Sequence, residues 1–238
     1  NVNGAYDETY PRAYEENSDA GGQSSLNSVG NWADDNAIIY KAPAIDLMGA
    51  TVNIGVEHSL QAGTGTSSDG VGAARSDTYG SGTGVGVTVG YGGLTLGAYG
   101  AERENKNQAV VDDVQDEFNG SMFVNYNFGP VSIGYQETYV DSAHQASVAA
   151  SVGADIEADM MGIAITQGDF SVSYAQQNET TQAVSATAAL LEVEMTAIQA
   201  SYSMGAMTLA ASMYETDNVG GVTAMKYEET ELSVSFAF

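Results

Sequence analysis

Side chains that perform nucleophilic or acid–base chemistry are sparse in this sequence. The chain has no cysteine and only two histidines, His58 and His144. A nucleophilic serine needs a base that a third group orients, and neither histidine stands in such an arrangement with an obvious serine and aspartate. Both histidines are isolated in the sequence, and a position at a polar rim accounts for each of them better than a role as a metal ligand. We therefore predict that the protein is not an enzyme.

Two short patterns suggest a bound ligand. Residues 80–84 read Gly-Ser-Gly-Thr-Gly, but they precede an alternating strand pattern, whereas a phosphate-binding loop opens a helix. Four carboxylates have a spacing that suits a hard cation such as Ca²⁺: Asp112, Asp113, Asp116 and Glu117. An exposed, self-repelling loop explains the same four residues. We predict no cofactor, with a loop-bound Ca²⁺ as the alternative.

Acidic residues dominate the charge of the chain. It holds 31 Asp and Glu against 6 Lys and Arg, a net charge of −25, which argues against nucleic acid as a partner. This excess favours either solubility in a salty medium or a field that attracts cations to the mouth of a pore. If residues 1–35 fold inward, five charged side chains are the candidates for a pore constriction, with the arginine as the local counter-charge: Asp7, Glu8, Arg12, Glu15 and Glu16. A solvated outer loop is the alternative for the same residues.

The elements that would position these charges are β-strands. Near the C-terminus, Leu232, Val234, Phe236 and Phe238 alternate with two serines and an alanine, so one face is apolar and the other small and polar. This pattern recurs and predicts eleven strands in residues 36–238, while residues 1–35 form a long loop. Short and long connections alternate strictly. We expect short connections at Gly92-Gly93, Gly129-Pro130, Gly168-Asp169 and Met204-Gly205, a first one beginning at Pro43, and a bulge near Ala197.

The polar face decides which way the apolar face points. It consists of Gly, Ser, Thr, Asn and Gln with hardly any lysine, unlike the charged outer face of a soluble sandwich. If the apolar face points towards lipid, the small polar residues line a water-filled interior. The aromatic residues near the short turns then form a girdle at the membrane interface. We therefore predict an all-β, antiparallel up-and-down transmembrane β-barrel. A dry cluster of Val87, Ile133, Val172 and Val234 would contradict this prediction.

Two stretches resemble the general porin family of Gram-negative bacteria. One is Asn36-x-Ile38-x-Tyr40-x-x-Pro43-x-x-x-x-x-Gly49, which is similar to the strand–turn–strand after that family's constriction loop. The other is the terminal Leu-Ser-Val-Ser-Phe-Ala-Phe, which is similar to its assembly-signal strand, with Phe236 and Phe238 at the end. The resemblance implies a sixteen-stranded barrel, of which this chain would carry the constriction loop and eleven strands. The first five strands, and the basic cluster that they carry in the family, would then lie outside this chain.

The resemblance also implies a function. It is passive diffusion of small hydrophilic solutes and ions through an outer-membrane pore, in a homotrimer in contact with the lipid bilayer and lipopolysaccharide. The acidic charge of this chain predicts that the pore favours cations. Lys41, Glu57 and Arg103 are weaker candidates for the pore lining. The alternative function is an acidic surface β-protein, either an adhesin or a calcium-binding β-sandwich, without channel activity.

Overall fold

The described residues form a single curved antiparallel sheet. The computed structural model describes residues 2–16, 37–60, 79–105, 116–141, 155–181, 191–219 and 222–237. A short 3-10 helix, η1 (Asn3–Ala5), precedes the strands. Within these ranges, no helix is long and apolar enough to cross a membrane.

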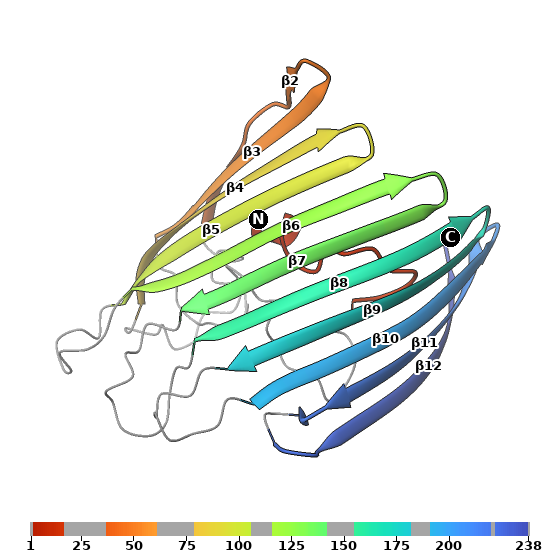
Figure 1. Ribbon diagram of the computed structural model, residues 1–238. Helices are drawn as coiled ribbons and strands as arrows, with labels where there is room; N and C mark the ends of the chain where they lie inside the picture. The colour runs from red at the N-terminus through yellow and green to blue at the C-terminus, as the bar shows by residue number, and fades with distance from the viewer. Residues whose placement is uncertain are drawn as a thin grey trace.

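The strands follow one another around the sheet in chain order (Figure 1). Their bounds are β1 (Ala37–Lys41), β2 (Ile45–Leu47), β3 (Ala50–Ser59), β4 (Tyr79–Tyr91), β5 (Leu94–Asn105), β6 (Glu117–Phe128), β7 (Val131–Asp141), β8 (Ile156–Gln167), β9 (Phe170–Thr181), β10 (Leu191–Met204), β11 (Met207–Asp217) and β12 (Lys226–Phe236). Because β1 and β2 both pair with β3, they are two parts of one interrupted strand. The sheet therefore has the eleven strand positions that the sequence predicts.

The first hairpin differs from the prediction. Pro43 does not begin a turn but interrupts the first strand between β1 and β2, because proline has no N–H to donate to the ladder. The turn comes later, at Met48 and Gly49, whose φ angles are 52° and 90°. The other four short connections lie where they were predicted, and each includes a glycine with positive φ: Gly92, Gly129, Gly168 and Gly205.

The predicted bulge near Ala197 is wrong. Strand β10 keeps an unbroken register with both β9 and β11, and the register shift lies instead between Tyr79 and Gly82, where β4 pairs with β5. Val193, Met195 and Ala197 are apolar yet buried on the polar face of the sheet. The change of phase therefore reflects burial on that face and not an irregular register.

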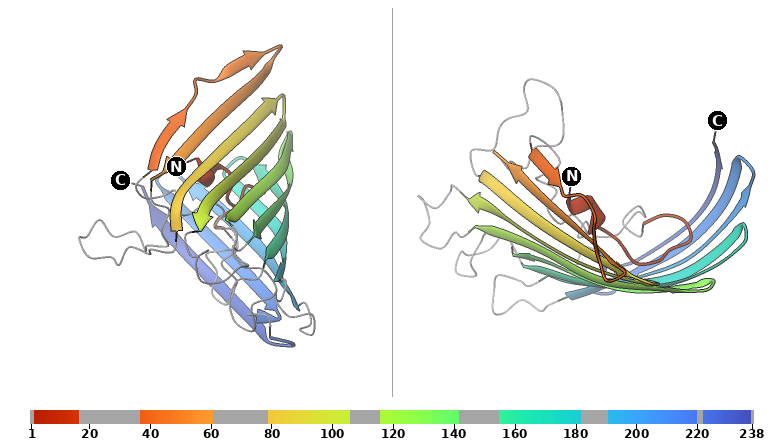
Figure 2. Two further views of the ribbon diagram at one scale, coloured as in Figure 1. Left: turned by 90° about the vertical axis from the view of Figure 1, so that its left-hand side faces the viewer. Right: turned by 90° about the horizontal axis from the view of Figure 1, so that it is seen from above.

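The apolar face of the sheet is its outer, convex face. Ile133 and Val234 are 43% and 51% exposed there, while Val87 and Val172 are half-buried, so these residues form no dry cluster. The aromatic residues near the short turns also point outward, among them Tyr91, Phe128 and Tyr202. Figure 2 shows the curvature of the sheet. The small and polar residues occupy its inner, concave face.

An acidic row bounds the apolar band of the outer face. On six strands, counted from the end that carries the short turns, the first carboxylate on the outer face comes after about eight residues. This corresponds to a height of roughly 20 Å along the axis of a barrel whose strands are tilted by about 40°. These residues are Glu102, Glu137, Asp159, Glu194, Glu215 and Glu228. A band of this height is close to the roughly 25 Å apolar band of outer-membrane barrels.

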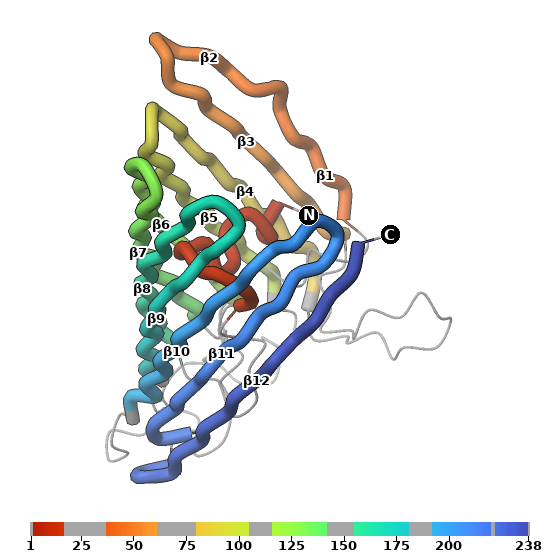
Figure 3. The backbone as a smooth tube through the Cα atoms, turned by 90° about the vertical axis from the view of Figure 1, so that its right-hand side faces the viewer, coloured from red at the N-terminus to blue at the C-terminus, as the bar shows by residue number. Residues whose placement is uncertain are grey.

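The sheet does not close on itself in the described residues. Strand β1 pairs only with β3, and β12 only with β11, so each leaves one edge without a strand partner there. Figure 3 shows this open arrangement, with the N-terminal segment inside the curve. The fold is thus an up-and-down antiparallel sheet with the form of an incomplete barrel.

Candidate functional site

Residues 2–16, which we call the inner segment, lie on the concave face of the sheet (Figures 2 and 3). The backbone N–H of Val2 donates to Glu57 Oε2 on β3 at 2.5 Å. At its other end, the Tyr14 hydroxyl donates to Glu231 Oε1 on β12 at 3.2 Å. The inner segment therefore runs across the sheet from one side to the other.

Side-chain amides and hydroxyls of β6 and β7 bind the first half of the inner segment. Ser121 Oγ and Gln136 Nε2 each donate to the Tyr6 carbonyl at 2.9 Å. The Thr9 N–H donates to Gln136 Oε1 at 2.7 Å, and Asn125 Nδ2 donates to the Thr9 carbonyl at 2.8 Å. Gln136 is fully buried, so both ends of its amide have protein partners, as a buried amide requires.

Strands β9 and β10 hold the second half in the same way. The Ala13 N–H donates to Ser173 Oγ at 2.8 Å, and Ser201 Oγ donates to the Ala13 carbonyl at 2.7 Å. Gln199 accepts from the Tyr14 N–H at 3.0 Å and donates to the Glu15 carbonyl at 2.8 Å. The polar face of the sheet is therefore a docking surface for the backbone of the inner segment.

Glycines on the inner face make room for this segment. A Cβ on Gly86 would collide with the Tyr6 ring, and a Cβ on Gly162 would lie 2.6 Å from the Pro11 carbonyl oxygen. Tyr6 stacks on Tyr99 with a centroid distance of 5.3 Å, and Tyr10 packs in a cluster with Met160, Ala197 and Tyr214. Of the apolar inner residues of β10, Ala197 belongs to this cluster, and both tyrosines are buried against the sheet.

The five predicted constriction residues all lie in the inner segment, in two different environments. Glu8 is 3% exposed and accepts a hydrogen bond from the Tyr10 hydroxyl at 2.8 Å, so it is held within the segment. Glu15 Oε1 accepts from the Tyr214 hydroxyl at 2.7 Å and from Ser212 at 3.2 Å. Arg12 pairs with Glu16, and both remain partly exposed.

The carboxyl group of Asp7 is perturbed by its surroundings in the inner segment. Burial, followed by the negative charges of Glu16 and Glu8, raises the pKa of Asp7 to about 6, against smaller opposing effects of a backbone hydrogen bond and of Arg12. The inner segment thus combines four carboxyl groups with one guanidinium, and the pKa of one of these carboxyls, Asp7, is raised above its ordinary value.

Two further acids face the segment from β12, and sequence reasoning did not single them out. Glu231 accepts from Tyr14, and Glu229 accepts from the Tyr227 hydroxyl at 2.9 Å. Both occupy the polar positions of a strand whose other face is apolar. The alternation of polar and apolar residues along β12 could have identified Glu229 and Glu231 as inner-face residues.

Two of the three weaker candidates do not face open space. Glu57 is fully buried, accepting from Val2 and from the Tyr99 hydroxyl at 2.6 Å, so it anchors the inner segment. Arg103 is 5% exposed and paired with Glu117 on the neighbouring strand. Both are inner-face residues in buried contacts, and their role in lining a pore stays a prediction. Lys41 is exposed at an inner-face position of β1.

The remaining predicted residues lie elsewhere. Phe236 is on the outer face and 57% exposed, whereas Phe238 lies outside the described residues. His58 is on the outer face, with Nδ1 2.9 Å from Thr83 Oγ1; His144 is not described. In the acidic loop, Asp112 and Asp113 are not described, and Glu117 is bound by Arg103 and Asn119. In the described part of the chain, no group of three or more His, Cys, Asp or Glu could hold a metal ion.

Comparisons with known proteins identify the fold. No protein-family model matches the chain, and no curated protein matches it in sequence. Among solved structures, the anion-selective porin from Comamonas acidovorans matches with a TM-score of 0.62 at 16% identity over 90% of this chain and 66% of that chain. The outer-membrane expressed OmpT of Vibrio cholerae matches with a TM-score of 0.59 at 14% identity over 99% of this chain and 73% of that chain. The predicted barrel fold is confirmed, and this chain spans about two thirds of the first neighbour's length.

Proposed function

We propose that this chain forms the wall and the constriction of a passive diffusion channel in the outer membrane of a Gram-negative bacterium. The channel would pass small hydrophilic solutes and ions and favour cations. The observation that carries the proposal is the inner segment, a charged stretch of chain hydrogen-bonded across the polar face of a porin-type sheet. A segment in this place narrows the space that the sheet surrounds and puts fixed charge beside any ion that passes.

The cation preference follows from the charges of this chain. The inner segment contributes Asp7, Glu15 and Glu16 against one arginine, and Glu229 and Glu231 face it from β12. One of the structural neighbours is the anion-selective porin from Comamonas acidovorans, so the shared fold does not determine selectivity. Selectivity in such a pore depends on the lining charges, which differ from protein to protein.

A soluble calcium-binding β-sandwich has no support from the structure. A sandwich buries its apolar residues between two sheets, whereas the described strands form one sheet with the apolar side chains exposed on its outer face. Catalysis is not proposed, because Ser212, which donates to Glu15, has no histidine base among the described contacts of either residue. We further propose that the complete protein forms a homotrimer, with the bilayer and lipopolysaccharide around its apolar band.

Ion selectivity in planar bilayers tests this function. The full-length protein is expected to open voltage-stable pores with a cation-favouring reversal potential in a salt gradient. In Glu15→Gln/Glu16→Gln, we expect the cation-to-anion permeability ratio to fall by at least about fivefold, because each unit charge about 4 Å from an ion in water contributes ~1 kcal/mol. Glutamine keeps an oxygen that accepts from Tyr214, so the inner segment should stay docked.

The matched control is Glu194→Gln/Glu228→Gln, which removes two charges from the outer face and should leave the ratio unchanged. An unchanged ratio in the inner double variant would remove Glu15 and Glu16 from the lining. Absence of conductance in a correctly folded, heat-modifiable wild-type protein would overturn the channel itself.

A further inference from the structure

The inner face of the sheet is uncharged next to the short turns. On each of the strands β3–β12, the first two inner-face positions counted from the short turn hold only Gly, Ala, Ser, Thr or Asn. Asn127, Ser132 and Ser235 are examples, and each is at least partly exposed. We call these positions the neutral zone, and at about 3.3 Å per residue they extend roughly 10 Å along the strands.

The edge strand and the short turns add little net charge to this zone. On the interrupted edge strand, Asp46 and Lys41 occupy inner-face positions and carry opposite charges. Among the short turns that the structure describes, the one between β8 and β9 is charged, through Asp169 at the rim of the sheet. The part of the wall nearest the short turns is therefore close to neutral.

The acidic residues of the inner face lie further from the short turns. The inner-face carboxylates of the described strands β3–β12 all come between the neutral zone and the long connections: Glu57, Glu117, Glu179, Glu229 and Glu231. Arg103 is the one inner-face base on these strands, and it pairs with Glu117. Glu229 and Glu231 are half-buried on β12, so their charge lies beside the inner segment.

The inner segment directs two of its carboxylates the same way. The Glu15 carbonyl oxygen accepts from Gln199 on β10, whereas the Glu15 carboxylate reaches Tyr214 on β11, one inner position further from the short turns. The Glu8 carboxylate accepts from the Tyr10 hydroxyl, and Tyr10 packs in the cluster that contains Tyr214. Both carboxylates therefore lie towards the long connections.

Uncharged residues of the inner segment contact the neutral zone. The Thr9 carbonyl accepts from Asn125, and the backbone of Ala13 bonds to Ser173 and Ser201. We call the carboxylates of the inner segment and of the inner face together the acidic zone. The wall is thus divided along its height into an acidic zone towards the long connections and a neutral zone at the short turns.

This division makes ion movement depend on the direction of the voltage. Fixed negative charge attracts cations and repels anions within about one Debye length, which is ~10 Å at ~0.1 M salt. When the voltage drives cations from the acidic zone into the neutral zone, anions cross the neutral zone the other way and are stopped at the acidic zone. Both ions then accumulate in the neutral zone, and conductance rises. The opposite voltage draws anions out of the neutral zone without replacing them, so conductance falls.

We propose that the pore rectifies ionic current, an inference that rests on the proposed channel function. It conducts more when the voltage drives cations from the acidic zone towards the short turns than when the voltage drives them the other way. In outer-membrane barrels the short turns are periplasmic, so cations pass more easily inward than outward under voltage. The position of the fixed charge along the pore thereby gives the channel a directional property in addition to its cation preference.

Single-channel currents of the full-length protein at equal and opposite voltages, with the same salt on both sides, test this proposal. We expect the ratio of the two currents to be at least about 1.5 at ~0.1 M salt and to approach 1 at about 1 M salt, where the Debye length falls to ~3 Å. Ala206 lies in the short turn between β10 and β11, so a bulky thiol reagent that blocks Ala206→Cys channels from one side identifies the side of the short turns. A ratio near 1 at the lower salt concentration, or a larger current in the opposite direction, would overturn the proposal.

Two double variants change the division of charge from opposite sides. Glu229→Gln/Glu231→Gln removes charge from the acidic zone, and Asn127→Asp/Ser235→Asp adds charge to the neutral zone, so each should bring the ratio closer to 1. Asn127→Gln/Ser235→Thr alters the same neutral positions without charge and should keep the wild-type ratio. All variants are compared as folded, heat-modifiable protein. A wild-type ratio in both charge-changing variants, or an equal loss in the uncharged variant, would contradict the proposal.

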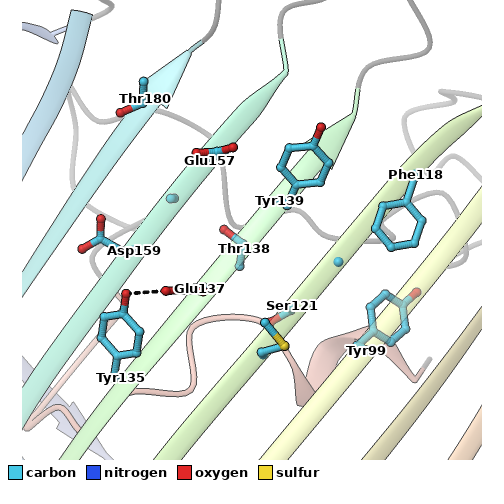
Figure 4. A pocket seen from close by; sticks show the side chains of 13 residues that line it. Tyr99, Phe118, Ser121, Tyr135, Glu137, Thr138, Tyr139, Glu157, Asp159 and Thr180 are labelled. Carbon is cyan, nitrogen blue, oxygen red and sulfur yellow. Dashed lines mark hydrogen bonds between the residues drawn. The ribbon is translucent and has the colours of Figure 1, made fainter.

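A matched control removes charge from the outer face of the sheet. Glu137 and Asp159 stand directly opposite each other on β7 and β8, and the Tyr135 hydroxyl donates to Glu137 Oε1 at 2.7 Å (Figure 4). The sheet separates these outer-face side chains from the pore. Glu137→Gln/Asp159→Asn should therefore keep the wild-type ratio. A loss of rectification as large as in the inner variants would indicate a general effect of surface charge and overturn the proposal.

Reversal potentials of the same channels distinguish this inference from the proposed function. A cation-selective pore with equal currents in both directions would overturn only the rectification. A pore that rectifies without a cation preference in a salt gradient would overturn only the proposed selectivity. Absence of conductance in folded protein would overturn the channel, and the rectification with it.

Discussion

At the scale of single residues, Asp7 makes the charge of the inner segment dependent on pH. Its pKa of about 6 lies above the ordinary value of 3.8, so its negative charge is lost as the pH falls through about 6. We expect the cation preference to decrease over this interval and Asp7→Asn to abolish that step. Reversal potentials between pH 7.5 and 5 measure this, and a step of the same size in Asp7→Asn would contradict the assignment.

The same shift affects how firmly the inner segment is docked. Because the folded-state pKa is raised, protonation favours the docked form, and the contribution of Asp7 to docking is lost as the pH rises from about 4 to about 6. Docking at neutral pH thus depends on the hydrogen bonds of the sheet and not on Asp7.

Glu57 is the residue whose loss should loosen the start of the inner segment most directly. Glu57→Ala leaves the Val2 N–H and the Tyr99 hydroxyl without their acceptor, which costs about 1–3 kcal/mol for each buried group left unsatisfied. We expect faster amide hydrogen exchange in residues 2–6, with Glu57→Gln in between because it keeps one acceptor oxygen. Unchanged exchange in the alanine variant would show that the segment is held without Glu57.

At the scale of elements, the glycines of β4 and β8 give the sheet its groove for the inner segment. Gly86→Val and Gly162→Val place side-chain atoms where Tyr6 and Pro11 now lie, so the segment should be displaced and single-channel conductance should rise. Gly90→Val is the matched control, because Gly90 lies on the same face of β4 with nothing within 4 Å of its Cβ position. An equal rise in the control would indicate a general effect of valine on the barrel.

Strand β10 shows how an element can satisfy two environments along its length. Near the short turn, Ile198 and Tyr202 point outward, as the alternation predicts. Further along, the inner positions Met195 and Ala197 are the apolar ones; both are buried, and Ala197 packs in the cluster around Tyr10 of the inner segment. The sequence shows the change of phase, but a bulge and a buried contact produce the same pattern.

At the scale of the whole molecule, the outward direction of the apolar face sets stability in a bilayer. Ile133→Arg places a charge in the apolar band and should lower the free energy of unfolding in lipid vesicles by about 2–4 kcal/mol. The neighbouring Ser132→Arg points to the inner face and should have a much smaller effect. Urea unfolding of both variants measures the difference, and equal destabilisation would contradict the orientation of the sheet.

The sequence alone determined the number of strand positions, four of the five short turns and the polarity of the two faces. These features follow from side-chain alternation and turn residues, which are local and need no knowledge of distant partners. Pro43 was misjudged because proline is compatible with both a turn and an interrupted edge strand.

Only the tertiary structure shows which inner-face residues the inner segment covers and which outer-face residues are cross-strand neighbours. Gln136 and Thr9 bond across a separation of 127 residues, and Glu57 is buried by Val2 at a separation of 55. The same holds for Glu137 and Asp159, which are brought together by cross-strand register. Such contacts depend on the register of the sheet and on the path of the inner segment, and local alternation contains no information about either.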